Sequence, residues 1–194
     1  SERSDVPSNR HPWIDDELVD RAVGHVLAGE SVVFIGAAGS GAPLYVSAVE
    51  AKVRAARPDL WRGALWCADA ASLSSEARVT LLENLRRPDV PVVVGLSSQP
   101  RTDAAAPEGR FASALSHAWL DGGAHRIDVG RLSDDALIRV MRDTESAGRL
   151  PLVSRARVIA WSNGVRIVAQ QLHAAAAAAG TDVHAQRRAM SRPH

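Results

Sequence analysis

Three glycines that follow the first strongly apolar stretch of the chain have the spacing of a phosphate-binding loop. The apolar run at residues 31–35 leads directly into the segment GAAGSGAP, and an apolar helical pattern begins there. Glycines between a strand and a helix form the P-loop, G-x-x-x-x-G-K-[ST], whose backbone N–H groups hold nucleotide phosphates. The candidate nucleotide-binding residues are therefore Gly36, Gly39, Ser40, Gly41 and Ala42.

The two side chains that carry the chemistry of this motif are absent. Ala42 stands where the motif has lysine, and Pro43 stands where it has serine or threonine. The lysine contacts the β and γ phosphates, the hydroxyl binds Mg²⁺, and proline also lacks a backbone N–H. Each hydrogen bond to a charged group contributes roughly 1.5–3 kcal/mol, so these losses weaken nucleotide binding by several orders of magnitude. A glycine-rich turn without any ligand is the alternative interpretation.

No nearby lysine can replace the missing one. Lys52 is the only lysine in the chain, and it lies about ten residues into the following helix. That separation is roughly 15 Å along a helix axis. The motif therefore predicts the fold of a P-loop more strongly than its chemistry.

Strands and helices alternate on either side of this loop. Apolar residues at helical spacing predict helices over residues 15–28, 42–57, 73–86 and 110–120. Apolar runs predict strands over residues 31–35, 64–68, 90–96 and 125–129. We therefore expect the α/β class, with a P-loop NTPase-like parallel sheet of about four strands covered by helices on both faces.

From residue 131 onward the sequence predicts helices only, which we interpret as a C-terminal helical lid. Ser133 is a good N-cap for a helix to about residue 146, and Asn163-Gly164 is a good C-cap between helices over 152–162 and 165–179. The expected organisation has four parts, which are a flexible N-terminus (1–12), the α/β domain (13–130), the helical lid (131–180) and a polar tail (181–194).

The composition argues against several kinds of site and partner. The net charge of +1 provides no field that would attract nucleic acid or a membrane surface. Cys67 is the single cysteine, and the seven histidines are scattered without an HxxxH pair, so neither a disulfide framework nor a metal site is expected. Without a signal peptide or an apolar run near 18 residues, the chain is expected to be soluble and cytoplasmic.

Two further residues are catalytic candidates. Asp69 follows the second predicted strand, at the sheet edge where open α/β sheets bind ligands. Its alternative role is to cap the next helix. Arg101 lies in the loop-like stretch 97–109, where it is a candidate phosphate-sensing or partner-sensing arginine, and a solvated loop arginine is the alternative.

Taken in order, these elements resemble the ATPase domain of AAA+/STAND regulators, particularly the large LuxR-family transcriptional regulators of actinobacteria. The resemblance covers about residues 13–173. Residues 36–41 match the family's GxAGxGK[ST] loop up to its last two positions. Residues 65–73 resemble its Walker B segment, with Asp69 at the second acid and Ala68 at the first, and residues 131–133 resemble the turn into its helical lid.

The resemblance also implies what has been lost. The family's sheet order is 5-1-4-3-2, and only about 25 residues separate Gly41 from the Walker B-like segment, where the family has a further strand and helix. Without that edge strand, four contiguous strands would remain, with a newly exposed edge. The absent lysine, hydroxyl and first acid all serve Mg-nucleotide, which implies that catalysis has been lost.

We therefore expect a pseudo-ATPase domain that acts as a regulatory or protein-interaction module in a signalling or transcription-linked protein. It would bind a protein partner or a second copy of itself, without a cofactor, and this chain alone would contact neither nucleic acid nor membrane. One alternative is an NTPase that binds ATP or ADP weakly and takes the missing charges from a partner subunit. Another is a LuxR-type regulator whose DNA-binding domain lies elsewhere.

Overall fold

The structure is a computed structural model that describes residues 13–87, 89–98, 107–121, 123–144 and 150–190. The chain divides into two compact units, Ser1–Gly130 and Arg131–His194. The predicted flexible N-terminus (1–12) and the candidate Arg101 lie outside the described residues. Within the described part of the chain, none of the helices combines the length and the hydropathy that crossing a membrane requires.

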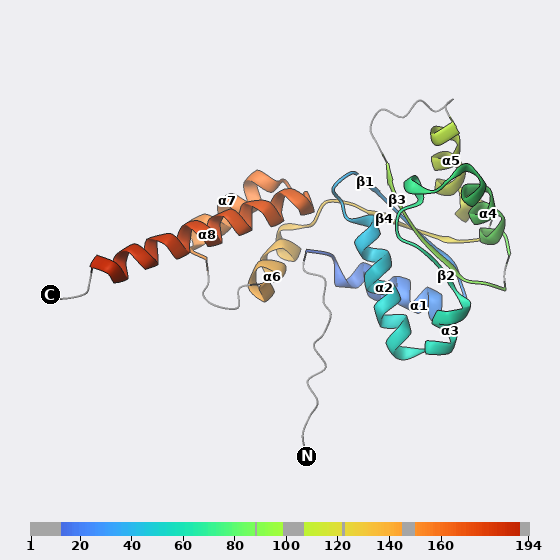
Figure 1. Ribbon diagram of the computed structural model, residues 1–194, viewed down its shortest axis with the longest axis horizontal. Coiled ribbons are helices and arrows are strands. Elements are labelled where there is room, and N and C mark those ends of the chain that lie inside the picture. The colour runs from blue at the N-terminus through green and yellow to red at the C-terminus, as the bar shows by residue number, and fades with distance from the viewer. Residues whose placement is uncertain (1–12, 88, 99–106, 122, 145–149, 191–194) are drawn as a thin grey trace, which may run out of the picture. The chain divides into compact units, whose positions relative to one another are not determined.

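The first unit is built on a four-stranded, all-parallel sheet (Figure 1). Its strands are β1 (Val32–Ala37), β2 (Leu65–Cys67), β3 (Val92–Ser98) and β4 (His125–Val129). They lie in the order β2-β3-β1-β4, with β1 paired to both β3 and β4. This confirms the predicted α/β class and the four parallel strands. The resembled family has the strand order 5-1-4-3-2. Removing its strand 2 leaves 5-1-4-3, which becomes 4-1-3-2 when the strands are renumbered along the chain. This is the order observed here, read from the opposite edge.

Helices cover both faces of this sheet. They are α1 (Asp16–Leu27), α2 (Ala42–Ala56), α3 (Pro58–Gly63), α4 (Ser75–Leu85) and α5 (Pro107–Ser116), with short 3-10 turns η1 (Ala70–Ser72) and η2 (Ala118–Asp121). On one face, Phe34 packs with α1 and α2 and contacts the ring of Tyr45. On the other, Val33 packs with α4 and α5. Successive strand residues point to opposite faces, so burial on both sides explains the continuous apolar runs.

The strands next to the glycine loop are longer than predicted at their carboxyl ends. β1 continues through Gly36 and Ala37, because Gly36 pairs with Ser97 of β3 and with Val129 of β4. The first glycine of the motif is therefore part of the sheet ladder. Similarly, β3 begins at Val92 and extends to Ser98, two residues beyond the predicted end.

A short helix that the sequence analysis missed follows α2. The predicted helix over residues 42–57 ends at Ala56, and α3 begins at Pro58. Proline is favourable at the first position of a helix because its missing N–H would be unbonded there. The corner is fixed by Arg57, whose Nε and Nη2 donate to the two carboxylate oxygens of Asp59 at 3.0 and 2.8 Å.

This ion pair gives a testable pH dependence. The hydrogen bond from Arg57 lowers the pKa of Asp59 from 3.8 to about 2. A carboxyl group with a lowered pKa in the folded chain stabilises it fully above its ordinary pKa, so this contribution is lost as the pH falls from 3.8 to about 2. Arg57→Ala is expected to return the pKa of Asp59 towards 3.8, measured by NMR titration of the side-chain carboxyl. An unchanged pKa in the variant would contradict the assigned cause.

Among its described residues, the second unit contains three helices, α6 (Asp134–Thr144), α7 (Leu152–Ser162) and α8 (Arg166–Met190) (Figure 1). Ser133 caps α6, since its Oγ accepts the Ala136 N–H at 3.2 Å. Asn163 and Gly164 form the turn between α7 and α8, with φ of +49° and +75°. These values confirm the predicted N-cap and C-cap.

The helix end predicted at residue 179 is wrong. Helix α8 continues through Gly180 to Met190. A glycine inside a helix costs only about 1 kcal/mol relative to alanine, and the residues beyond it include good helix formers such as alanine, glutamine and arginine. The polar composition that predicted a tail is therefore compatible with a continued helix.

Candidate functional site

The glycine loop connects the carboxyl end of β1 to the first turn of α2. Gly39 and Gly41 have φ of +84° and +87°, a conformation that residues with a side chain rarely adopt. Gly41 is the N-cap of α2, and Ala42 is its first residue. The structure thus places the five predicted loop residues in one continuous strand–turn–helix segment at the edge of the sheet where open α/β folds bind ligands.

Both the backbone and the side chain of Ser40 make their contacts inside this loop. Its N–H donates to the carbonyl of Ala37 at 3.0 Å, which forms a tight turn with Gly39 at its third position. Its Oγ lies directly over Gly36, in the space that a Cβ there would occupy. This Oγ is buried and has no hydrogen-bond partner among the described residues. The N–H of Ser40 is therefore used within the loop, whereas the N–H groups of a working P-loop face the phosphates.

The first turn of α2 offers few donors to an anion. A helix normally begins with four N–H groups that lack partners inside the helix. Here Pro43 has none, and the N–H of Leu44 bonds to the carbonyl of Gly41 at 2.8 Å. Ala42 is completely buried. The helix start is thus packed into the unit and has lost part of its hydrogen-bonding capacity.

Backbone atoms fill the space between the start of α2 and the end of β2. A Cβ on Gly95 of β3 would lie 2.5 Å from the carbonyl oxygen of Ala68 and 3.2 Å from the carbonyl of Ala42. Ala42 and Ala68 are the positions of the P-loop lysine and the first Walker B acid in the resembled family. In this chain their backbones pack against the same glycine, with methyl groups in place of a cation and an acid.

Asp69 adopts the capping role that was its alternative to catalysis. Its Oδ1 accepts the N–H of Ala71 at 3.1 Å, which caps the 3-10 turn η1. Its carbonyl also accepts the hydroxyl of Ser72 at 2.8 Å. The first of these contacts uses the carboxylate locally, and a role as a catalytic acid stays a prediction. Arg101, the other candidate, is not among the described residues.

Lys52 is engaged far from the loop. Its Nζ lies 2.6 Å from Oδ1 of Asp20, so the pair joins the exposed surfaces of α2 and α1. From its place in the sequence, Lys52 is too distant to replace the motif lysine, and in the structure its ion pair with Asp20 gives it a separate partner.

The structure brings together two histidines that are far apart in the sequence and one glutamate. Oε2 of Glu30 lies 2.7 Å from Nδ1 of His25 and 2.9 Å from Nε2 of His125. The hydrogen bond from His25 lowers the pKa of Glu30. This cluster lies at the amino end of β1 and β4, opposite the glycine loop. Because His125 depends on the pairing of β4 with β1, spacing in the sequence could not have found it.

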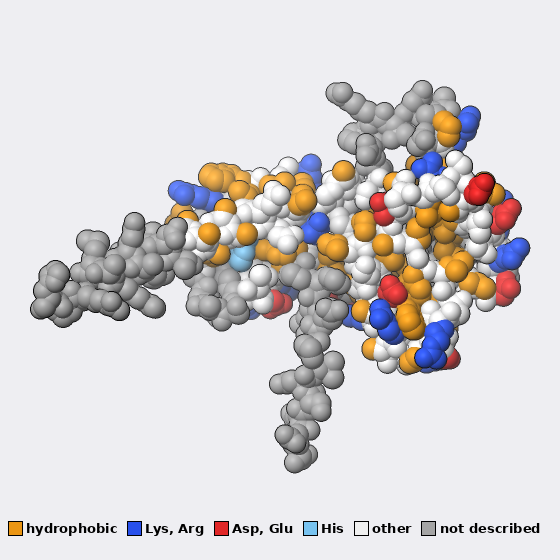
Figure 2. All heavy atoms as spheres, viewed as in Figure 1, with side chains coloured by type: hydrophobic (Ala, Val, Ile, Leu, Met, Phe, Trp, Pro, Cys, Tyr) orange, Lys and Arg blue, Asp and Glu red, His pale blue; other side chains and the backbone are white. Residues whose placement is uncertain are grey.

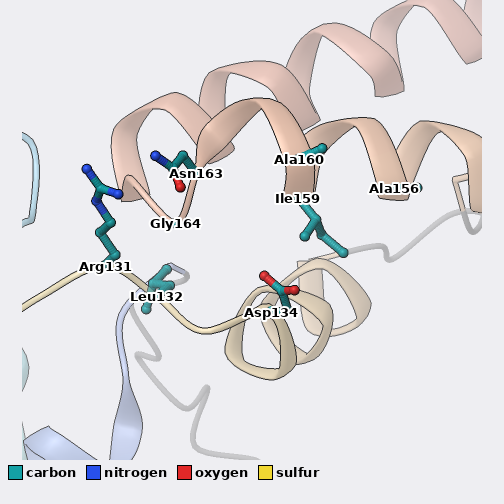
Figure 3. A pocket seen from close by; sticks show the side chains of 8 residues that line it. All are labelled: Arg131, Leu132, Asp134, Ala156, Ile159, Ala160, Asn163 and Gly164. Carbon is teal, nitrogen blue, oxygen red and sulfur yellow. The ribbon is translucent and has the colours of Figure 1, made fainter.

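An open pocket of about 550 Å³ lies within the second unit (Figure 3). It is lined by Arg131, Leu132, Asp134, Ala156, Ile159, Ala160, Asn163 and Gly164. The side chains of Arg131 and Asn163 lie at one end, and those of Asp134 and Ile159 lie at the other (Figure 3). The polar groups therefore do not converge on one point, and none of the predicted site residues lines this pocket.

The chain matches no known protein-family model, and no curated protein is significantly similar to it. The resemblance to AAA+/STAND ATPase domains thus stays a prediction that depends on the motifs and on the strand order.

Proposed function

We propose that this chain is an ATPase-like domain that does not turn over ATP and that acts as a regulatory module through protein contacts. One observation carries the proposal, namely a loop with the glycine spacing of a P-loop whose lysine and hydroxyl are replaced and whose Ser40 N–H bonds inside the loop. A domain of this kind would serve a signalling or transcription-linked protein.

The three replaced positions around the loop would all have served the same ligand. The lysine position, the hydroxyl position and the first acid position hold Ala42, Pro43 and Ala68. Each missing charge-assisted hydrogen bond weakens binding by roughly 1.5–3 kcal/mol, and the three positions serve the same Mg-nucleotide. Their joint replacement supports a fold that has been retained for a purpose other than hydrolysis.

Exposed apolar side chains on both units support the protein-interaction part of the proposal. In the first unit, β2 is a short edge strand that pairs only with β3 in the described sheet, and its Leu65 is 41% exposed. In the second unit, Leu152, Val153 and Trp161 of α7 are 79%, 63% and 67% exposed. Hydrophobic side chains reach the visible surface of both units (Figure 2). Exposed strand edges and apolar groups are typical of contact surfaces.

The retained backbone of the loop favours a second candidate, a weak nucleotide binder that takes its missing charges from a partner. Gly39 and Gly41 keep the positive φ that a phosphate-binding turn requires. The N-terminus of α2 also carries the partial positive charge that attracts anions. The two candidates differ in whether the chain alone binds Mg-ATP.

Thermal unfolding with nucleotide distinguishes these candidates. A ligand present at 100 times its dissociation constant stabilises the folded chain by about 2.7 kcal/mol, which raises the Tm of a domain of this size by several degrees. We expect millimolar ATP or ADP, with or without Mg²⁺, to leave the Tm unchanged. We also expect no phosphate release above the rate without protein. A Mg-dependent rise of several degrees would contradict the proposal.

A further inference from the structure

We propose that His25, Glu30 and His125 form a binding site for a divalent transition-metal ion of the zinc type. Two imidazole nitrogens and a carboxylate oxygen are the ligands that zinc commonly takes in proteins. The three ligand atoms all lie within 4.8 Å of one another. This site is separate from the glycine loop, since it lies at the opposite edge of the sheet and does not depend on nucleotide binding.

The convergence of the two rings on a single oxygen is the main geometric argument. Nδ1 of His25 and Nε2 of His125 approach the same atom, Oε2 of Glu30, at 2.7 and 2.9 Å. The carboxylate supplies a negative charge that compensates part of the charge of a divalent ion, and each imidazole binds the ion through a ring nitrogen that carries no hydrogen.

Backbone hydrogen bonds hold all three residues in place before any ion binds. Helix α1 ends in a Schellman motif, in which the N–H of Glu30 bonds to the carbonyl of His25 at 3.0 Å and Gly29 has φ of +82°. This motif brings the side chains of His25 and Glu30 to the same side. The third ligand is fixed by the sheet, because the N–H of His125 bonds to the carbonyl of Ser31 at 2.7 Å.

The two imidazole rings must move apart slightly to accept an ion between them and Glu30. They are stacked with centroids 3.7 Å apart and planes 18° apart, whereas a metal lies near the plane of each imidazole that binds it. Glu30 and His125 have side chains that are 47% and 45% exposed, so both can adjust. Ligands about 2.0–2.1 Å from a tetrahedral ion lie roughly 3.3 Å apart, so binding should lengthen both nitrogen–oxygen distances.

Three protein ligands leave a coordination position for water. A structural zinc site normally has four protein ligands, whereas sites with three keep one position for water or another ligand. Among the described residues, the cluster offers only these three. We therefore expect the bound ion to keep one coordination position for water, at a surface where a small ligand can reach it.

The test is calorimetric titration of Zn²⁺ into the full, untagged chain, with the visible absorption of Co²⁺ as a second readout. We expect one ion to bind with tetrahedral-type Co²⁺ absorption. Glu30→Gln and His125→Ala should each weaken binding by at least about 100-fold, because losing groups outside the first coordination shell already costs 10–100-fold. His117→Ala is the matched control, since this exposed histidine bonds to the Ser113 carbonyl away from the cluster.

The outcomes separate the site from the other histidines. Glu30→Gln conserves the shape of the side chain, and circular dichroism without metal establishes that each variant is folded. Zn²⁺ should raise the Tm of the wild type and of His117→Ala, but not that of the two cluster variants. The proposal is overturned if the wild type binds no Zn²⁺ or if folded Glu30→Gln binds it as tightly as the wild type.

Discussion

Gly95→Ala is expected to destabilise the α/β unit by roughly 3 kcal/mol, at the upper end of the range for overpacked cores. The new methyl group would lie 2.5 Å from the carbonyl oxygen of Ala68 and 3.2 Å from the carbonyl of Ala42. Both neighbours are backbone atoms, in the first turn of α2 and in the bend between β2 and η1, so neither can move aside as a flexible side chain would. Urea unfolding followed by circular dichroism measures the loss.

Gly24→Ala is the matched control for that substitution. Gly24 lies inside α1, and a Cβ there would meet nothing within 4 Å. Alanine in a helix interior is more favourable than glycine by roughly 0.5–1 kcal/mol, so this variant should be slightly more stable than the wild type. If Gly95→Ala were as stable as Gly24→Ala, the space between the start of α2 and the end of β2 could not be filled by backbone atoms. The close packing described beside the glycine loop would then be wrong.

The second large effect is expected in the helical unit, from Gly164→Ala. Gly164 has φ of +75°, and its Cβ would lie 2.5 Å from the carbonyl oxygen of Leu132. The left-handed conformation alone costs an alanine roughly 1–2 kcal/mol, and the clash adds to it. The substitution would also disturb the bond from the Leu132 N–H to the Gly164 carbonyl at 2.8 Å. We expect a loss of roughly 2–4 kcal/mol.

Hydrogen exchange monitored by mass spectrometry measures this loss locally, through faster exchange of the amides of α7 and α8. The control is Gly180→Ala in the same unit, where a Cβ would meet nothing within 4 Å and the residue lies inside α8. This variant should exchange no faster than the wild type. Equal exchange in Gly164→Ala and Gly180→Ala would contradict the described turn.

Most of the fold could be predicted because the apolar pattern is strong. The strand over residues 125–129 and the helix over 152–162 have the predicted bounds, since each has clear turn residues at its ends. The ends of β1 and β3 could not be predicted, because they depend on pairs such as Gly36 with Ser97 that only the assembled sheet defines. Helix α3 was not predicted because proline is typical of the residues just after a helix as well as of a helix start, and Pro58 begins a new helix.

The candidate site was predictable in position but not in detail. The spacing of the glycines located the loop, and the capping alternative for Asp69 followed from its place before a helical turn. The internal bond of Ser40 could not be foreseen, since it depends on the loop conformation. Gly95 did carry a signal, because an isolated glycine within a valine-rich strand indicates a close backbone approach. The proximity of His25 and Glu30 could also have been predicted from the sequence, because the two residues occupy the ends of a Schellman motif around Gly29.

The most direct test of the central claim is isothermal titration of Mg-ATP into the wild-type chain and into the double variant Ala42→Lys/Pro43→Thr. The variant restores a cation, a hydroxyl and a backbone N–H, and each hydrogen bond to a charged group contributes roughly 1.5–3 kcal/mol. The account predicts no binding to the wild type at millimolar nucleotide, and a gain in the variant of at least about 100-fold. Micromolar, Mg-dependent binding to the wild type would contradict it, because the chain would then hold nucleotide without the groups that the motif requires.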